Sequence, residues 1–229
     1  MSNATVVLVH GAWHGPWCWE RVTPLLDRQG VPWATVDRRA GDPPVVSSDP
    51  HFDDLVTRVV IGQIDGPVVL VGHSQGGAAI TFAGVGNSQV RHLVYLAAIM
   101  PGVEPWLAPT QELIDGIVVA EGGRAFDPAA ADVFYGDCTP ADVDWVLGQL
   151  HLQGTLPEGT LPSPAFAWQE KPSTYVVCTE DRALPPDGQR GCAAHASEVV
   201  EWPTSHSPFI SRPELVADLL VDLAGRYAE

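Results

Sequence analysis

Residues 67–83 join three features in a fixed order: an apolar run, a glycine-bounded turn and a helix-compatible run. The apolar run at residues 67–72 leads into the pentapeptide GHSQG, whose central residue is Ser74. A serine between a strand and a helix requires a sharp, strained turn, and the flanking glycines let the two elements approach closely. Such a turn exposes the hydroxyl at the carboxyl end of the strand, where open α/β sheets bind ligands. We therefore predict a nucleophilic serine, with a structural turn of small residues as the alternative.

The rest of the chain alternates β-branched runs with amphipathic runs, a pattern typical of βαβ units. The strand-like runs are apolar on both faces, which indicates a parallel sheet covered by helices on both sides. The expected strands are residues 5–10, 31–37, 67–72, 90–97, 174–179 and 198–202, and the expected helices are residues 17–29, 52–64, 75–83 and 213–227. The predicted fold class is α/β, with a doubly wound and mostly parallel sheet.

Residues 101–170 break this rhythm with a stretch rich in proline, glycine and tryptophan. Helix-like pieces occur in it at residues 111–121 and 140–150. We interpret the stretch as a small helical cap that interrupts a single core formed by residues 1–100 and 171–229.

Composition excludes several classes of partner. The formal net charge is −16 and only 12 residues are lysine or arginine, so the chain lacks the cationic surface that nucleic acids require. The apolar runs are shorter than the roughly 20 residues of a membrane helix, and the first residues do not resemble a signal peptide. The four cysteines are scattered and expected to be reduced, with one disulfide left open. We expect a cytoplasmic protein without nucleic acid or membrane partners.

A serine nucleophile needs a base and an acid that orients the base. His206 lies in a short polar loop between the last expected strand and the last expected helix, so it should emerge at the carboxyl edge of the sheet. Asp181 follows the strand at residues 174–179, which gives the order serine, aspartate, histidine along the chain. Glu180 is the close alternative to Asp181, because adjacent residues cannot both point at one histidine.

Backbone N–H groups complete the expected site. An oxyanion hole uses the N–H of the residue after the nucleophile and one from the loop after the first strand, here Gln75 and Ala12. The loop sequence HGAWHGPW at residues 10–17 contains two glycines that let its backbone approach a ligand.

With these residues identified, the chain resembles the α/β-hydrolase superfamily, and within it the branch of plant methylesterases, hydroxynitrile lyases and small bacterial esterases. The resemblance rests on LVHGAWHGPWCW (8–19), LVGHSQGG (70–77), VVCTEDRALPP (176–186) and SHSPF (205–209). It assigns Ser74, Asp181 and His206 to a catalytic triad and implies a cap inserted after the sixth-strand position. The cap is shorter than in the plant members and matches them poorly.

The same resemblance separates two chemistries. Lyases of this branch carry threonine after the first motif's histidine and lysine after the catalytic histidine, whereas this chain has Gly11 and Ser207, and its only lysine is Lys171. Ester hydrolysis is therefore preferred over hydroxynitrile lyase-like cleavage. A ligand-binding protein on a hydrolase scaffold is the alternative from another class.

The resulting hypothesis is hydrolysis of a small carboxylic ester through an acyl-enzyme, without metal or other cofactor. The expected partner is the small-molecule ester, and the sequence is also compatible with a homodimer. Six aromatic residues are candidates for an apolar substrate pocket, namely Trp13, Trp106, Phe126, Phe134, Trp145 and Trp168.

Overall fold

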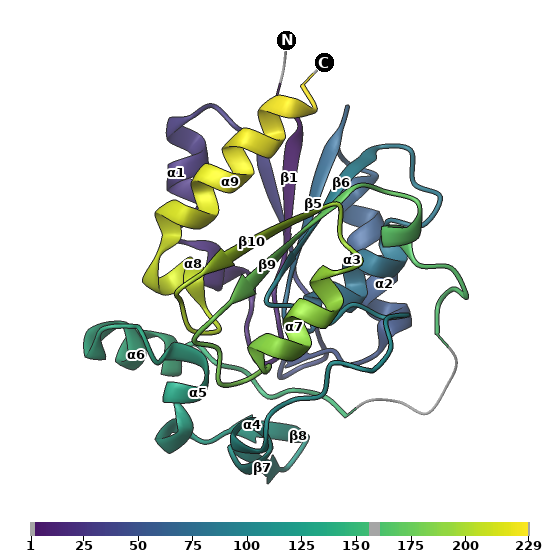
Figure 1. Cartoon of the computed structure of the whole chain (residues 1–229). Helices are drawn as coiled ribbons and strands as arrows, with labels where there is room; N and C mark the ends of the chain where they lie inside the picture. The colour runs from purple at the N-terminus through teal and green to yellow at the C-terminus, as the bar shows by residue number, and fades with distance from the viewer. Residues whose placement is uncertain (1–2, 156–160, 229) are drawn as a thin grey trace.

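The computed structural model describes residues 3–155 and 161–228 and contains one six-stranded parallel sheet (Figure 1). Its order is β10-β9-β6-β5-β1-β2. The strands are β1 (Thr5–Val9), β2 (Trp33–Val36), β5 (Val68–His73), β6 (Val90–Leu96), β9 (Ser173–Cys178) and β10 (Glu198–Trp202). The order reverses beside β1, because the chain first adds β2 on one side and then all later strands on the other. This reversal is the position at which such sheets form a crevice for ligands.

Helices cover both faces of the sheet, which explains why the strands are apolar on both sides. In β1, Val6 and Leu8 belong to one buried cluster, while Val7 and Val9 belong to the other. The first cluster is closed by α9 (Pro213–Arg226), against which α1 (Thr23–Arg28) and α8 (Pro208–Ser211) pack. The second lies under α2 (Pro50–Ile61), α3 (Gly76–Ala83) and α7 (Pro186–Ala193). The predicted doubly wound α/β fold is confirmed.

The described part of the chain between β6 and β9 adds no strand to the main sheet, and its residues 111–147 lie at the carboxyl ends of the strands (Figure 1). Its described elements are α4 (Gln111–Asp115), β7 (Ile117–Ala120), β8 (Gly123–Phe126), η2 (Pro128–Ala130), α5 (Asp132–Tyr135), α6 (Pro140–Leu147) and η3 (Ala167–Gln169). It begins after β6, which is the sixth strand along the chain and the fourth of the main sheet. We call residues 101–170 the cap segment.

Two expected helices differ from the structure. The helix expected at residues 111–121 ends at Asp115, and the β-branched run that follows Gly116 pairs with β8 as an antiparallel hairpin. The cap segment is therefore not purely helical. The stretch expected as one helix at residues 17–29 consists of η1 (Pro16–Trp19) and α1, and Pro24 lies in the first turn of α1.

Several smaller elements had no counterpart in the sequence-based expectations. A hairpin of two short strands, β3 (Arg39–Ala40) and β4 (Val45–Val46), follows β2, and α7 follows β9.

All four cysteines are free thiols. Among the described residues no helix combines the length and apolarity needed to cross a membrane.

Candidate active site

Ser74 lies at the sharp turn between β5 and α3 and has a φ of +52°, in the left-handed region. Its carbonyl accepts hydrogen bonds from the N–H groups of Gly77 and Ile99 at 3.0 and 3.1 Å, which hold the turn in place. The flanking glycines are sterically required. A Cβ on Gly72 would lie 2.6 Å from the Gly76 carbonyl oxygen, and a Cβ on Gly76 would lie 2.6 Å from that of Val9. The turn presents Ser74 to a cavity at the carboxyl edge of the sheet.

His206 and Asp181 form a buried pair on the loops after β10 and β9. The Nδ1 of His206 lies 2.6 Å from Oδ2 of Asp181, and both side chains are almost completely buried. The Nε2 of His206 is buried without a hydrogen-bond partner among the described residues, and His206 lines the same cavity as Ser74. Glu180 is exposed, and none of the described side-chain hydrogen bonds joins its carboxylate to a histidine. The geometry therefore joins His206 to Asp181.

The Asp181 carboxylate is held by three further donors. Its Oδ1 accepts from the backbone N–H groups of Ala183 and Leu184 at 2.7 and 2.9 Å. Its Oδ2 also accepts from the amide of Gln189 at 2.8 Å. Gln189 is completely buried on α7 and accepts from the backbone N–H of Cys178 through its own oxygen. The carboxylate thus has a single orientation, toward His206.

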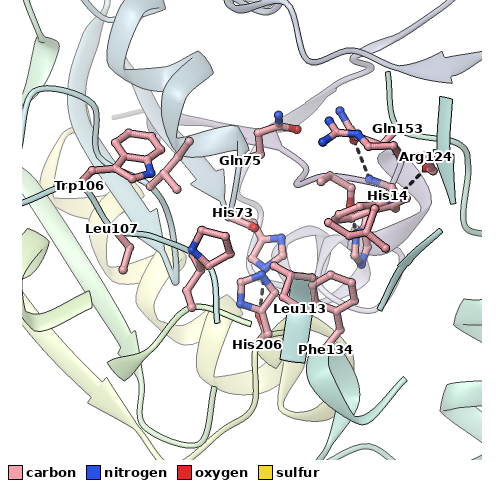
Figure 2. A pocket seen from close by; sticks show the side chains of 17 residues that line it. His14, His73, Gln75, Trp106, Leu107, Leu113, Arg124, Phe134, Gln153 and His206 are labelled. Atoms are coloured by element: carbon pink, nitrogen blue, oxygen red, sulfur yellow. Dashed lines mark hydrogen bonds between the residues drawn. The ribbon is translucent and has the colours of Figure 1, made fainter. Parts of the chain in front are cut away.

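His73 fixes the backbone on the other side of His206. Its Nε2 donates to the His206 carbonyl oxygen at 2.9 Å, a bond drawn between the two labelled residues in Figure 2. Burial lowers the pKa of His73 well below its ordinary value, so the ring is neutral at pH 7.

The loop after β1 brings Ala12 to the cavity, where Gln75 also lies. Within the described residues neither backbone N–H has a hydrogen-bond partner. The Ala12 carbonyl accepts from Nδ1 of His14 at 2.7 Å, and Tyr135 donates its hydroxyl to Nε2 of the same ring at 2.8 Å. Burial lowers the pKa of His14 to about 4, so this neutral ring has one fixed tautomer. The arrangement leaves two N–H groups available for an oxyanion.

A buried ion pair between Arg38 and Asp53 lies next to the loop after β1 and to Gln75. Arg38 is completely buried and lies 2.6 Å from Asp53. Its guanidinium also donates to the carbonyl of His10 at 2.9 Å and to the side-chain oxygen of Gln75 at 3.1 Å. One cation thereby connects the loop after β1 to the residue that follows Ser74.

The cavity has a volume of about 200 Å³ and a predominantly apolar wall. Three of the aromatic candidates line it, namely Trp13, Trp106 and Phe134. The wall also contains Ala12, His14, His73, Ser74, Gln75, Ile99, Leu107, Pro109, Leu113, Ile117, Arg124, Gln153, Leu184 and His206 (Figure 2).

The other three aromatic candidates do not line this cavity. Phe126 is buried behind the wall, with its ring 4.4 Å from that of Phe134. Trp145 packs edge-on against Trp17 at 5.6 Å, on the outer side of the loop after β1. Trp168 donates its indole N–H to the carbonyl of Pro101 at 2.8 Å. These three side chains pack against other residues instead. The sequence pattern could not distinguish an aromatic residue with a packing role from one that lines the pocket.

Several residues of the site were not predicted. His14 stands within the glycine-rich motif of the loop after β1, so the motif itself could have indicated it. Gln189, Arg124 and Gln153 have no local signal, because they reach the site only through tertiary packing of α7 and the cap segment.

The doubly wound sheet and the arrangement of Ser74, His206 and Asp181 are typical of α/β hydrolases. The comparison with known sequences agrees with this class. Residues 6–219 match the α/β hydrolase family, and the chain belongs to that family.

Among curated proteins, the chain is similar to a pyrethroid hydrolase of Sphingobium wenxiniae, with 28% identity over 100% of this chain and 90% of the relative. It is also similar to methylesterase 7 of Arabidopsis thaliana, with 29% identity over 97% and 96% of the two chains. Among solved structures, a pyrethroid hydrolase from Sphingobium faniae has a TM-score of 0.78 at 29% identity, covering 97% of each chain. These relatives support a carboxylic ester hydrolase of the α/β-hydrolase type.

Proposed function

We propose that this enzyme hydrolyses small carboxylic esters through an acyl-enzyme on Ser74. The observation that carries the proposal is the buried pair of His206 Nδ1 and Asp181 Oδ2, 2.6 Å apart. The Nε2 of this histidine has no partner among the described residues, and His206 lines the cavity that also contains the strained Ser74. Methyl esters are a natural first class to test, because several of the similar proteins are named methylesterases.

In the proposed first step, Ser74 Oγ attacks the ester carbonyl while His206 Nε2 accepts its proton. The C–O bond to the alcohol then breaks, and the leaving alkoxide takes that proton from His206. Asp181 holds the ring through Nδ1 and stabilises the imidazolium formed in each step. The N–H groups of Ala12 and Gln75 would bind the negative oxygen of both tetrahedral intermediates. In the second step, a water molecule attacks the acyl carbon while His206 Nε2 accepts its proton. The bond between the acyl carbon and Ser74 Oγ then breaks, and Ser74 takes that proton from His206 as the carboxylic acid leaves.

A packing observation opposes the lyase alternative. A Cβ on Gly11 would lie 2.9 Å from both His73 Nδ1 and Ser74 Cβ, so there is no room for the threonine that lyases of the branch carry there. The position of their lysine is occupied by Ser207, which is completely buried. Cyanide release from mandelonitrile is accordingly expected to be absent.

The deciding experiment measures hydrolysis of p-nitrophenyl acetate and butyrate by the wild type, Ser74→Ala and Ser88→Ala. Ser88 lies in the turn before β6, so its variant controls for the substitution itself. We expect activity to vanish only in Ser74→Ala, and a fluorophosphonate probe to label Ser74 in the wild type. A silent, unlabelled wild type would instead favour the ligand-binding alternative.

A further inference from the structure

Arg124 is a cation in the predominantly apolar wall of the cavity. It belongs to β8 in the cap segment, and its backbone pairs with that of Gln153 through two hydrogen bonds of 2.8 Å. One terminal nitrogen donates to the carbonyl of Gly154 at 2.8 Å, whereas the Nε is buried without a partner among the described residues. Arg124 therefore lines the cavity with a guanidinium whose N–H groups are only partly paired among the described residues.

The charge of Arg124 also lacks a partner. Arg38 and Arg182 pair with Asp53 and Glu112, at 2.6 and 2.7 Å, but within the described residues no carboxylate lies at ion-pair distance from Arg124. A guanidinium remains protonated at all physiological pH values, and burying part of an unpaired charge is costly. The chain has 28 acidic and 12 basic residues, so carboxylates are plentiful, yet none of those described pairs with Arg124. A carboxylate of a bound ligand can supply the missing partner.

The position of Arg124 in the cavity suits this role. Figure 2 shows Arg124 and Gln153 on one side of the view and Trp106 and Leu107 on the other, with His206 between the two groups. A ligand whose ester group lies at His206 therefore has an apolar wall on one side and a cation on the other.

We propose that Arg124 binds a carboxylate of the substrate, so that the preferred substrates are small esters carrying a second, anionic group. The planar guanidinium presents parallel N–H donors that match the two oxygens of a carboxylate. The net charge of −16 disfavours the approach of anions, so any preference for them must arise inside the cavity. The inference rests on the proposed ester hydrolysis and specifies its substrate class.

The test compares pairs of esters that differ by a carboxylate in place of a methyl group. Monomethyl adipate is compared with methyl hexanoate, which has the same number of carbon atoms and a methyl group in place of the carboxylate. In the same way, 4-acetoxybenzoate is compared with p-tolyl acetate. The two pairs place the anion on the acyl side and on the alcohol side of the ester. The kcat/KM ratio of the anionic to the neutral ester is measured for the wild type, Arg124→Met and Arg124→Lys.

We expect Arg124→Met to lower the ratio roughly tenfold or more in one of the pairs, as is typical of a lost hydrogen bond to a charged group. Hydrolysis of the neutral esters should change less than about threefold, and Arg124→Lys should restore part of the ratio. Arg226→Met removes a positive charge from an exposed ion pair on α9 and should leave the ratio unchanged. Thermal unfolding of each variant verifies that the cap segment remains folded.

An unchanged ratio in both pairs, with intact Ser74-dependent hydrolysis of the neutral esters, would overturn the role of Arg124 alone. If the wild type hydrolyses no ester of either pair, or if Ser74→Ala retains the activity, the proposed function fails instead.

Discussion

The choice of Asp181 as the proposed acid rests on side-chain geometry rather than on its place in the motif. Glu180 and Asp181 are adjacent and equally acidic in the sequence, yet Glu180 is exposed while Asp181 is buried and bonded to His206. The direction of a loop side chain depends on the N–H groups that receive it, here those of Ala183 and Leu184. The sequence alone could therefore narrow the choice to two residues but not decide it.

Asp181→Asn should lower kcat by about four orders of magnitude, the loss typical of triads whose histidine takes the wrong tautomer. Glu180→Gln is the matched control and should change kcat less than about twofold. Steady-state kinetics with p-nitrophenyl butyrate measures both variants. Comparable losses in the two would contradict the assignment.

At the scale of elements, the sequence predicted the sheet well and the cap segment poorly. Strands such as β5 and β9 are buried on both faces, so their continuous apolar runs stand out. The strands β7 and β8 are short and mostly half-buried or exposed, and β8 also bridges to Gln153, which is distant in the sequence. The pocket contributed by this segment was accordingly the least predictable part of the site.

The helix α7 has a role at the site that its sequence does not indicate, since Gln189 carries the amide that holds Asp181. Gln189→Ala should lower kcat roughly tenfold, because it removes a hydrogen bond to a charged group, with a smaller effect on KM. Arg190→Ala, on the exposed side of the same helix, should retain full activity. An increase in KM with an unchanged kcat in Gln189→Ala would argue against a positioning role.

For the whole molecule, four buried histidines make stability dependent on pH. Burial lowers the pKa of His14 and of His92 to about 4, and lowers those of His10 and His73 well below the ordinary value. Between about pH 6.5 and pH 4 the unfolded chain therefore binds more protons than the folded one. The free energy of unfolding should be highest above about pH 6.5 and should decrease as the pH falls from there toward 4.

Urea titrations at pH 7.5, 6.5, 5.5 and 5.0 would measure this dependence. His92→Gln removes one of the four groups far from Ser74, and should reduce the slope by up to about 1.4 kcal/mol per pH unit. A slope identical to that of the wild type would show that His92 titrates normally in the folded state.

The proposed base follows β10, and β10 lies at the edge of the sheet with β9 as its one strand neighbour there. Ser74 follows β5, which has strands on both sides. Edge elements open more readily than central ones. Catalysis therefore depends on one edge of the sheet. As the urea concentration rises, turnover should cease before circular dichroism detects loss of the sheet, and during refolding turnover should be the last native property to return.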